Sequence, residues 1–122
     1  MGTLLETKTV GVVGFGRIGQ RVAKLVASFG AKVIVSDPYT DTTDYENCAL
    51  DELCQRVEVL TLHLPYVEKT HNLIGSRQFQ LMKKGSFVIN VSRGGLIDEI
   101  ALLQALESEH IAGAALDCFE QE

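Results

Sequence analysis

The sequence predicts an α/β protein built on a doubly wound parallel sheet, and three observations carry that prediction. Five short apolar runs recur along the 122 residues, helix-like segments lie between them, and most of the connecting loops are short. Each run is nearly continuous in Val, Ile, Leu or Ala, which is typical of a strand buried on both faces of a parallel sheet. The length and a hydrophobic content of 46% suit a single domain over residues 1–122.

The expected elements alternate strand and helix along the chain. The five apolar runs cover residues 10–13, 32–35, 57–62, 87–91 and 113–116. Between them, apolar residues at helical spacing predict helices over residues 17–29, 50–56, 76–83 and 99–108. Gly30 follows the first expected helix, and glycine is the usual residue just past the C-terminus of a helix. Because parallel neighbours need a crossover, this order gives strand–helix–strand units with a ligand crevice at the carboxyl ends of the strands.

A glycine-rich turn joins the first expected strand to the first helix. Residues 14–19 read Gly-Phe-Gly-Arg-Ile-Gly, the pattern of Rossmann-type dinucleotide sites, in the strand–helix context that the pattern requires. Gly14 permits the tight turn, Gly16 lets a phosphate approach the backbone, and Gly19 lets the helix lie close to the strand. The helix N-terminus then offers free N–H groups to a pyrophosphate. A plain glycine-containing turn remains the alternative.

Asp37 ends the second expected strand, where a carboxylate can accept hydrogen bonds from both ribose hydroxyls of adenosine. The alternative is a surface-turn Asp before Pro38. The segment from residue 33 to residue 55 has no Lys or Arg, and after Asp37 it carries five acidic side chains: Asp41, Asp44, Glu46, Asp51 and Glu52. A 2′-phosphate would meet like charge there, so we expect NAD rather than NADP, with Arg17 as the one nearby cation that weakens this expectation.

Two charged residues follow the last two expected strands. Arg93 comes after the fourth strand, between Ser92 and two glycines. A guanidinium binds a planar carboxylate through two parallel hydrogen bonds, so Arg93 is a candidate for binding an acidic group. Asp117 ends the fifth strand, where it could accept a hydrogen bond from a nicotinamide carboxamide. A solvent-facing Arg and an ordinary strand-end Asp are the alternatives.

Composition excludes several classes of function. The net charge is −5 and the Lys and Arg residues are spread along the chain, so no nucleic-acid surface is expected. No apolar run approaches the roughly 20 residues of a membrane span and no secretory pattern is present, so we expect a soluble, cytoplasmic protein. Three cysteines without Cys-x-x-Cys spacing predict neither a disulfide framework nor a metal site. None of His63, His71 and His110 is well placed as a proton carrier.

With these residues in view, the whole chain resembles the nucleotide-binding domain of the D-2-hydroxyacid dehydrogenases. The resemblance is carried, in order, by residues 8–19, 37–39, 62–70, 90–99 and 113–122. It implies a Rossmann-type domain that binds NAD. It also implies a longer enzyme that transfers a hydride between NAD and a 2-hydroxy or 2-oxo acid, with 3-phosphoglycerate as the favoured small-molecule substrate.

The resemblance also implies roles for individual residues. Arg93 would bind the substrate carboxylate and carbonyl, and Glu122 would pair with the catalytic His. The residues expected to contact NAD are Gly14, Gly16 and Gly19 with Arg17, Ile18 and Thr70 at the phosphates, Asp37 at the ribose, Leu64 and Pro65 beside the adenosine, and Val91, Arg93 and Asp117 around the nicotinamide. Ser92 is expected to contact the cofactor as well.

The sequence departs from the family in three respects. It has no substrate domain, no His where the family carries its catalytic one, and no counterpart to the sixth strand of the full sheet. We therefore expect a truncated domain of about five strands that binds NAD without turnover. A bare sheet edge and uncovered apolar surface would favour homo-oligomers. Two alternatives stay open: an NAD-sensing transcriptional corepressor domain, and an isolated nucleotide-binding module, including one made to test fold evolution.

Overall fold

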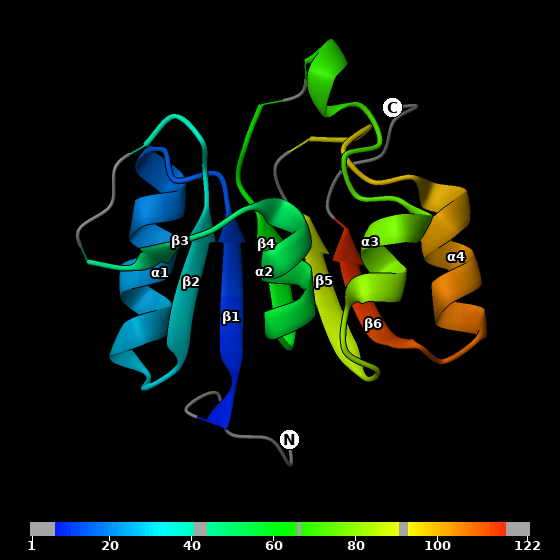
Figure 1. Cartoon of the computed structure of the whole chain (residues 1–122), viewed down its shortest axis with the longest axis horizontal. Coiled ribbons are helices and arrows are strands. Elements are labelled where there is room, and N and C mark those ends of the chain that lie inside the picture. The colour runs from blue at the N-terminus through cyan, green and yellow to red at the C-terminus, as the bar shows by residue number, and fades with distance from the viewer. Residues whose placement is uncertain (1–6, 41–43, 66, 91–92, 117–122) are drawn as a thin grey trace.

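The computed structural model describes residues 7–40, 44–65, 67–90 and 93–116, which form a parallel sheet with helices on both faces (Figure 1). The strands follow the order β3-β2-β1-β4-β5-β6 across the sheet. Their bounds are Thr9–Val13 for β1, Lys32–Ser36 for β2, Glu46–Asn47 for β3, Val59–Leu62 for β4, Ser86–Asn90 for β5 and Ile111–Leu116 for β6. Because β2 and β4 flank β1, the sheet extends in both directions from its first strand and is doubly wound, as predicted.

The sheet has six strands where the sequence predicted about five. All five expected strands are present, and the additional one, β3, lies at the edge beside β2 and not beyond β6. It pairs in parallel with β2, Ile34 with Glu46 and Val35 with Asn47. Both residues of β3 are polar and exposed, so a hydrophobic pattern could not reveal this strand, which forms through its backbone.

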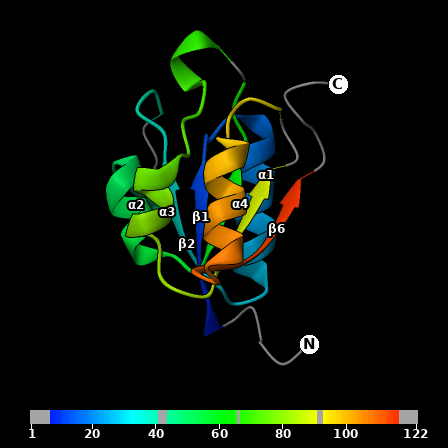
Figure 2. The ribbon, with the colours of Figure 1, turned by 90° about the vertical axis from the view of Figure 1, so that its right-hand side faces the viewer.

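The four expected helices are α1 (Arg17–Ser28), α2 (Leu50–Arg56), α3 (Ser76–Leu81) and α4 (Glu99–Glu107), and a short 3-10 helix, η2 (Glu68–Thr70), was not predicted. Helix α1 covers one face of the sheet over β1 and β2, whereas α2, α3 and α4 cover the other (Figure 2). The side chain of Asp98 begins α4 by accepting hydrogen bonds from the N–H groups of Ile100 and Ala101. None of the described helices is long and apolar enough to cross a membrane.

Each face of the sheet has its own core. Leu53, Phe79 and Leu102 belong to the core under α2, α3 and α4. Ala23 of α1 packs with Val12 of β1 on the opposite face. Since all strand pairs are parallel, the loops that follow β1, β2, β4 and β5 gather at one edge of the sheet, at the top of Figure 1. The described candidate site residues lie in these loops or in the first turn of α1.

Candidate functional site

The turn between β1 and α1 packs tightly at two of its three glycines and is open at the third. Gly14 has a φ of +89°, and a Cβ there would collide with the carbonyl oxygen of His63. A Cβ on Gly19 would collide with the carbonyl oxygen of Gly14, so α1 lies directly against the turn. A Cβ on Gly16 would meet no atom within 4 Å. The space beside Gly16 is therefore where a ligand can approach the backbone.

The N-terminus of α1 begins at this open space. Gly16 precedes the helix in an extended conformation, and among the described residues no side chain caps the helix and no acidic residue lies in its first turn. The first N–H groups of a helix have no partner within the helix and lie at the positive end of its dipole. This end of α1 is suited to a phosphate group.

Asp37 lies beside the same turn, because its carboxylate binds two backbone N–H groups. Its Oδ2 accepts a hydrogen bond from Phe15 at 2.7 Å, and its Oδ1 accepts one from Tyr39 at 2.8 Å. The carboxylate therefore joins the loop after β2 to the glycine-rich turn. Each oxygen keeps a further lone pair, so the group can still accept hydrogen bonds from sugar hydroxyls.

Asn47 of β3 holds the backbone of Asp37 in its turn, a role that was not predicted from the sequence. Its Oδ1 accepts a hydrogen bond from the N–H of Asp37 at 3.1 Å. Its Nδ2 donates to the carbonyl oxygens of Asp37 and Thr40, each at 2.9 Å. The sequence offers no more than an Asn ten residues after Asp37, which has no meaning until β3 is known to pair with β2.

A pocket of about 600 Å³ brings together residues from three loops that the sequence analysis had treated separately. It is lined by Gly16, Arg17, Ile18, His63, Leu64, Pro65 and Arg93. The exposed Arg93 follows β5, and the buried side chain of Asn90, also missed by the sequence analysis, donates a hydrogen bond to its carbonyl oxygen at 2.8 Å. Two guanidinium groups, those of Arg17 and Arg93, thus border one cavity, which suits an anionic ligand.

Other predicted site residues do not line this pocket. The hydroxyl of Thr70 accepts a hydrogen bond from the N–H of Val67 at 2.8 Å and lies within 3.2 Å of the carbonyl oxygens of Val67 and Pro65. It closes its own loop, so a contact of Thr70 with phosphates stays a prediction. Asp37 borders the glycine-rich turn and not the pocket. Four residues lie outside the described part of the chain: Val91, Ser92, Asp117 and Glu122.

His63 lines the pocket together with Arg17 and Arg93. Its ring is half-buried, and its Nε2 lies 2.8 Å from Oγ1 of Thr61. Burial lowers the pKa of His63 below its ordinary value of 6.5, because a charged imidazolium is poorly solvated there. The neutral ring is therefore the favoured form at neutral pH. His110 lies elsewhere, with its Nε2 2.8 Å from the carbonyl oxygen of Met82.

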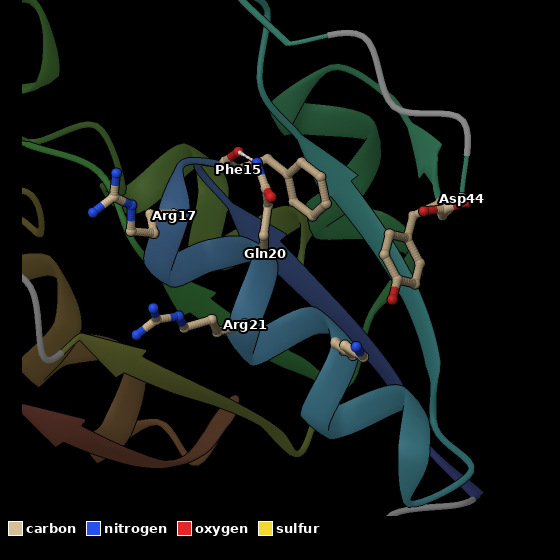
Figure 3. A pocket seen from close by; sticks show the side chains of 7 residues that line it. Phe15, Arg17, Gln20, Arg21 and Asp44 are labelled. Atoms are coloured by element: carbon tan, nitrogen blue, oxygen red, sulfur yellow. Dashed lines mark hydrogen bonds between the residues drawn. The ribbon is translucent and has the colours of Figure 1, made fainter.

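A second pocket, of about 330 Å³, lies along α1 (Figure 3). It is lined by Phe15, Arg17, Gln20, Arg21, Lys24, Asp44 and Tyr45. Figure 3 shows the side chains of Arg17 and Arg21 extending from α1 on the side away from Asp44. The rings of Phe15 and Tyr45 meet edge to face, with centroids 5.8 Å apart. In addition to Arg17, helix α1 therefore contributes two further cations, Arg21 and Lys24, to the lining of this second pocket.

The acidic segment after Asp37 is less available to a ligand than its sequence suggested. Three of its five acidic residues form ion pairs with arginines of α2 or α3. The pairs are Glu46 and Glu52 with Arg56, and Asp51 with Arg77, at N–O distances between 2.6 and 3.1 Å. Asp44 lines the second pocket, and Asp41 lies outside the described residues. The electrostatic argument for expecting NAD rather than NADP therefore rests chiefly on Asp37.

Comparison with known sequences gives a consistent result. Residues 1–122 match the family model described as D-isomer specific 2-hydroxyacid dehydrogenase, NAD binding domain. The chain is 46% identical to a D-3-phosphoglycerate dehydrogenase of Methanocaldococcus jannaschii, in a match that covers 99% of this chain and 24% of the relative. It is 42% identical to a D-2-hydroxyacid dehydrogenase (NAD+) of Lacticaseibacillus paracasei, over 100% of this chain and 38% of the relative. The chain spans about a quarter of the phosphoglycerate dehydrogenase and less than half of the other relative.

Solved structures share the fold closely. A D-2-hydroxyisocaproate dehydrogenase superposes with a TM-score of 0.95 at 41% identity, over 98% of this chain and 37% of that one. A D-lactate dehydrogenase from Aquifex aeolicus, complexed with NAD and lactic acid, superposes with a TM-score of 0.94 at 37% identity, over 99% of this chain and 38% of that one. In both, the shared part is the smaller portion of a longer chain.

Proposed function

The chain belongs to the D-isomer specific 2-hydroxyacid dehydrogenases, as their NAD-binding domain, and we propose that it holds NAD for hydride transfer to or from C2 of a 2-hydroxy or 2-oxo acid in a longer protein. The observation that carries the proposal is the pocket that both Gly16, at the start of α1, and Arg93 line. The helix end suits the phosphates of a dinucleotide, and the guanidinium suits a carboxylate.

The residues present fit NAD. Gly16 leaves open space at the uncapped end of α1, where a Cβ would meet no protein atom within 4 Å. Asp37 offers a carboxylate next to the same turn and forms no ion pair among the described residues. Its negative charge favours the two ribose hydroxyls over a 2′-phosphate. When bound, NAD supplies the hydride acceptor or donor.

Arg93 is the residue that we propose binds the substrate. Its backbone is fixed through Asn90, while its side chain is exposed at the pocket wall. Paired hydrogen bonds from the guanidinium would hold the carboxylate and draw electron density from the adjacent carbonyl oxygen. We propose that Glu122, which lies outside the described residues, pairs with a His that the longer protein contributes.

We propose 3-phosphoglycerate as the substrate of the longer protein. The support is the 46% identity to a D-3-phosphoglycerate dehydrogenase, against 37% for the D-lactate dehydrogenase structure. Both 3-phosphoglycerate and lactate carry the carboxylate and the neighbouring C2 that Arg93 would contact, so Arg93 does not choose between them. Oxidation of 3-phosphoglycerate by the longer protein, measured beside lactate at equal concentration, tests the choice; faster turnover of lactate would contradict it.

Titration of the 122-residue chain with NADH tests the cofactor function directly. We expect saturable binding, with NADPH weaker by at least about tenfold because its phosphate meets Asp37. We also expect no NAD reduction by this chain with 3-phosphoglycerate, because we propose that the His that accepts the proton comes from the longer protein and not from the pocket that Arg93 lines. Absence of NADH binding would refute the cofactor function, and appreciable NADH formation would refute the need for an outside His.

We further propose that the chain self-associates through apolar surface. Strand β6 forms an edge of the described sheet, and Ile18 and Leu25 of α1 and Phe29 directly after it are each about 60% exposed. Light scattering over a concentration series should show a dimer or a larger species. Leu25→Lys should weaken the association if α1 carries it. A monomer at the highest concentration would refute the proposal.

We propose a cytoplasmic location for this protein. Cys48 and Cys54 are free thiols, and burial raises the pKa of Cys54 to about 12. Free thiols are usual in a reducing compartment. Fractionation of cells that express the protein tests the location, and recovery from an oxidising compartment would contradict it.

A further inference from the structure

We propose that Asn47 is a positioning residue for Asp37. Its side-chain amide fixes the backbone that presents the Asp37 carboxylate to the adenosine ribose, so Asn47 raises the affinity for NAD without touching the cofactor. This inference rests on the proposed function as an NAD-binding domain. It assigns a purpose to β3, the strand that the hydrophobic pattern did not predict.

All three polar groups of the Asn47 amide, one oxygen and two N–H groups, form hydrogen bonds with the loop that follows β2. Its Oδ1 accepts from the N–H of Asp37 at 3.1 Å, and its two N–H groups are directed at the carbonyl oxygens of Asp37 and Thr40, each at 2.9 Å from Nδ2. An amide turned by 180° would oppose donor to donor and acceptor to acceptor, so only this orientation satisfies the contacts. Asp37 is therefore held on both sides of its Cα, which fixes the direction of its side chain.

The carboxylate of Asp37, directed in this way, joins its own loop to the glycine-rich turn. The Asp37 carboxylate bonds the N–H groups of Phe15 and Tyr39, the first of which lies between Gly14 and Gly16. Without Asn47, the loop would be ordered by those two hydrogen bonds and, at its start, by the bond from the N–H of Gly14 to the carbonyl oxygen of Ser36 at 3.0 Å. The loop would then sample more conformations before binding, and the conformational entropy lost when NAD orders it would lower the affinity. The expected result is weaker binding with the same contacts in the bound state.

Strand β3 is itself anchored on both sides of Asn47. Before it, Glu46 accepts two hydrogen bonds from the guanidinium of Arg56 on α2, at 2.6 and 2.9 Å. After it, the N–H of Cys48 donates to the carbonyl oxygen of Val35 on β2 at 2.9 Å. The strand can be as short as two residues because Glu46 is bound to α2 and Cys48 is bound to β2. The backbone of Asn47 is therefore held in place on both sides.

A double-mutant cycle on the NADH affinity of the 122-residue chain tests this role. Asn47→Ala should weaken NADH binding by about five- to tenfold, the effect expected for losing a small number of hydrogen bonds. In an Asp37→Ala background the same substitution should change the affinity by less than about twofold, because the group that it positions is absent. Asn47→Asp keeps one acceptor but sets a charge against two carbonyl oxygens, so it should bind no better than Asn47→Ala.

A matched control and a ligand-free measurement complete the test. Gln104→Ala removes an exposed amide on α4 that makes no side-chain hydrogen bond among the described residues, and it should leave NADH binding unchanged. In the absence of NADH, Asn47→Ala should speed hydrogen exchange at the N–H groups of Asp37 and Tyr39. An equal loss of affinity in both backgrounds, wild-type affinity in Asn47→Ala, or unchanged exchange would overturn the role. If the unsubstituted chain fails to bind NADH, the proposed function fails, and exchange at Asp37 still decides whether Asn47 holds the loop.

Discussion

The Asp37 end and the Arg93 end of the site are held in different ways. The backbone of Asp37 is fixed by Asn47, and its carboxylate already binds the N–H of Phe15. The side chain of Arg93 forms no ion pair among the described residues, and only its carbonyl oxygen is held, by Asn90. The first end therefore has its hydrogen-bond geometry in place before a ligand arrives, whereas the second keeps a charge available. Under the proposed function, the Asp37 end would hold the cofactor in a prepared position and the Arg93 end would bind the reacting acid.

The largest expected effect lies at the Arg93 end. Arg93→Gln in the longer protein should lower kcat/KM by about a thousandfold, or about 4 kcal/mol, because a charge that stabilises the reacting carboxylate and carbonyl is lost. The NADH affinity should change by less than about threefold. Steady-state kinetics and NADH titration measure the two. Arg93→Lys keeps the charge without the paired geometry and should restore only part of the rate. A parallel fall in NADH affinity would place Arg93 at the cofactor end instead.

Substitutions in the glycine-rich turn should show separate effects on stability and on NADH binding. Gly14→Ala should lower the free energy of unfolding by about 2–3 kcal/mol, because Gly14 has a positive φ and its Cβ would collide with His63. Gly16→Ala should change it by less than about 1 kcal/mol, since the space is open, yet weaken NADH binding. Urea unfolding and NADH titration measure the two effects. Equal stability of the two variants would show that the turn is not packed as described.

At the Asp37 end, Asp37→Ala should weaken NADH binding by about thirtyfold, or about 2 kcal/mol, since a charged acceptor of ribose hydrogen bonds is removed. NADPH should lose less, so the selectivity between the two cofactors should fall. Asp44→Ala is the matched control, because Asp44 is an exposed carboxylate that lines the second pocket. Its affinity for NADH should stay within about twofold of the unsubstituted chain. Preserved selectivity in Asp37→Ala would move the preference for NAD to another residue.

The smallest expected effect concerns His63, which lines the same pocket as Arg93. The pKa of His63 is lowered from 6.5 by burial, so below that pH the unfolded chain binds a proton that the folded chain resists, and the stability falls as the pH drops. The loss begins near pH 6.5 and ends at the lower pKa of the folded state. Urea midpoints between about pH 7.5 and about pH 5.5 measure it. His63→Gln should lose this part of the pH dependence, His71→Gln should retain it, and identical profiles in all three would exclude His63 as the cause.

Much of the fold could be predicted from the sequence because most of the strands bury continuous apolar side chains. Strands β1, β2, β4, β5 and β6 all lie where apolar runs occur, and Gly30 marks the end of α1. Strand β3 escaped prediction because its pairing with β2 uses backbone groups, while its side chains, Glu46 and Asn47, are polar and exposed. A pattern of side-chain hydrophobicity contains no record of such pairing.

The parts of the site that depend on sheet topology could be predicted from the sequence. The parts that depend on which side chains form hydrogen bonds or ion pairs could not. Gly16 and Arg93 could be expected to meet, because the loops after parallel strands share one edge of the sheet. The contact between Asn47 and Asp37 could not, since it depends on the register of β3. The ion pair of Glu46 with Arg56 also escaped, because a sequence displays charges without their partners. The acidic segment after Asp37 therefore looked more repulsive to phosphate than it is.

The packing of Gly14 against His63 has a consequence for the order of folding. Strands β1 and β2 are joined through α1 and are close in the sequence, whereas β1 meets β4 only after a much longer loop has closed. Closing that loop costs more chain entropy, so this pairing is expected later in folding. One wall of the glycine-rich turn is the backbone of His63, directly after β4, so the turn is incomplete until β4 docks. We therefore expect affinity for the cofactor to arise late in folding, and bound NAD to slow the step in which β4 separates from β1 during unfolding.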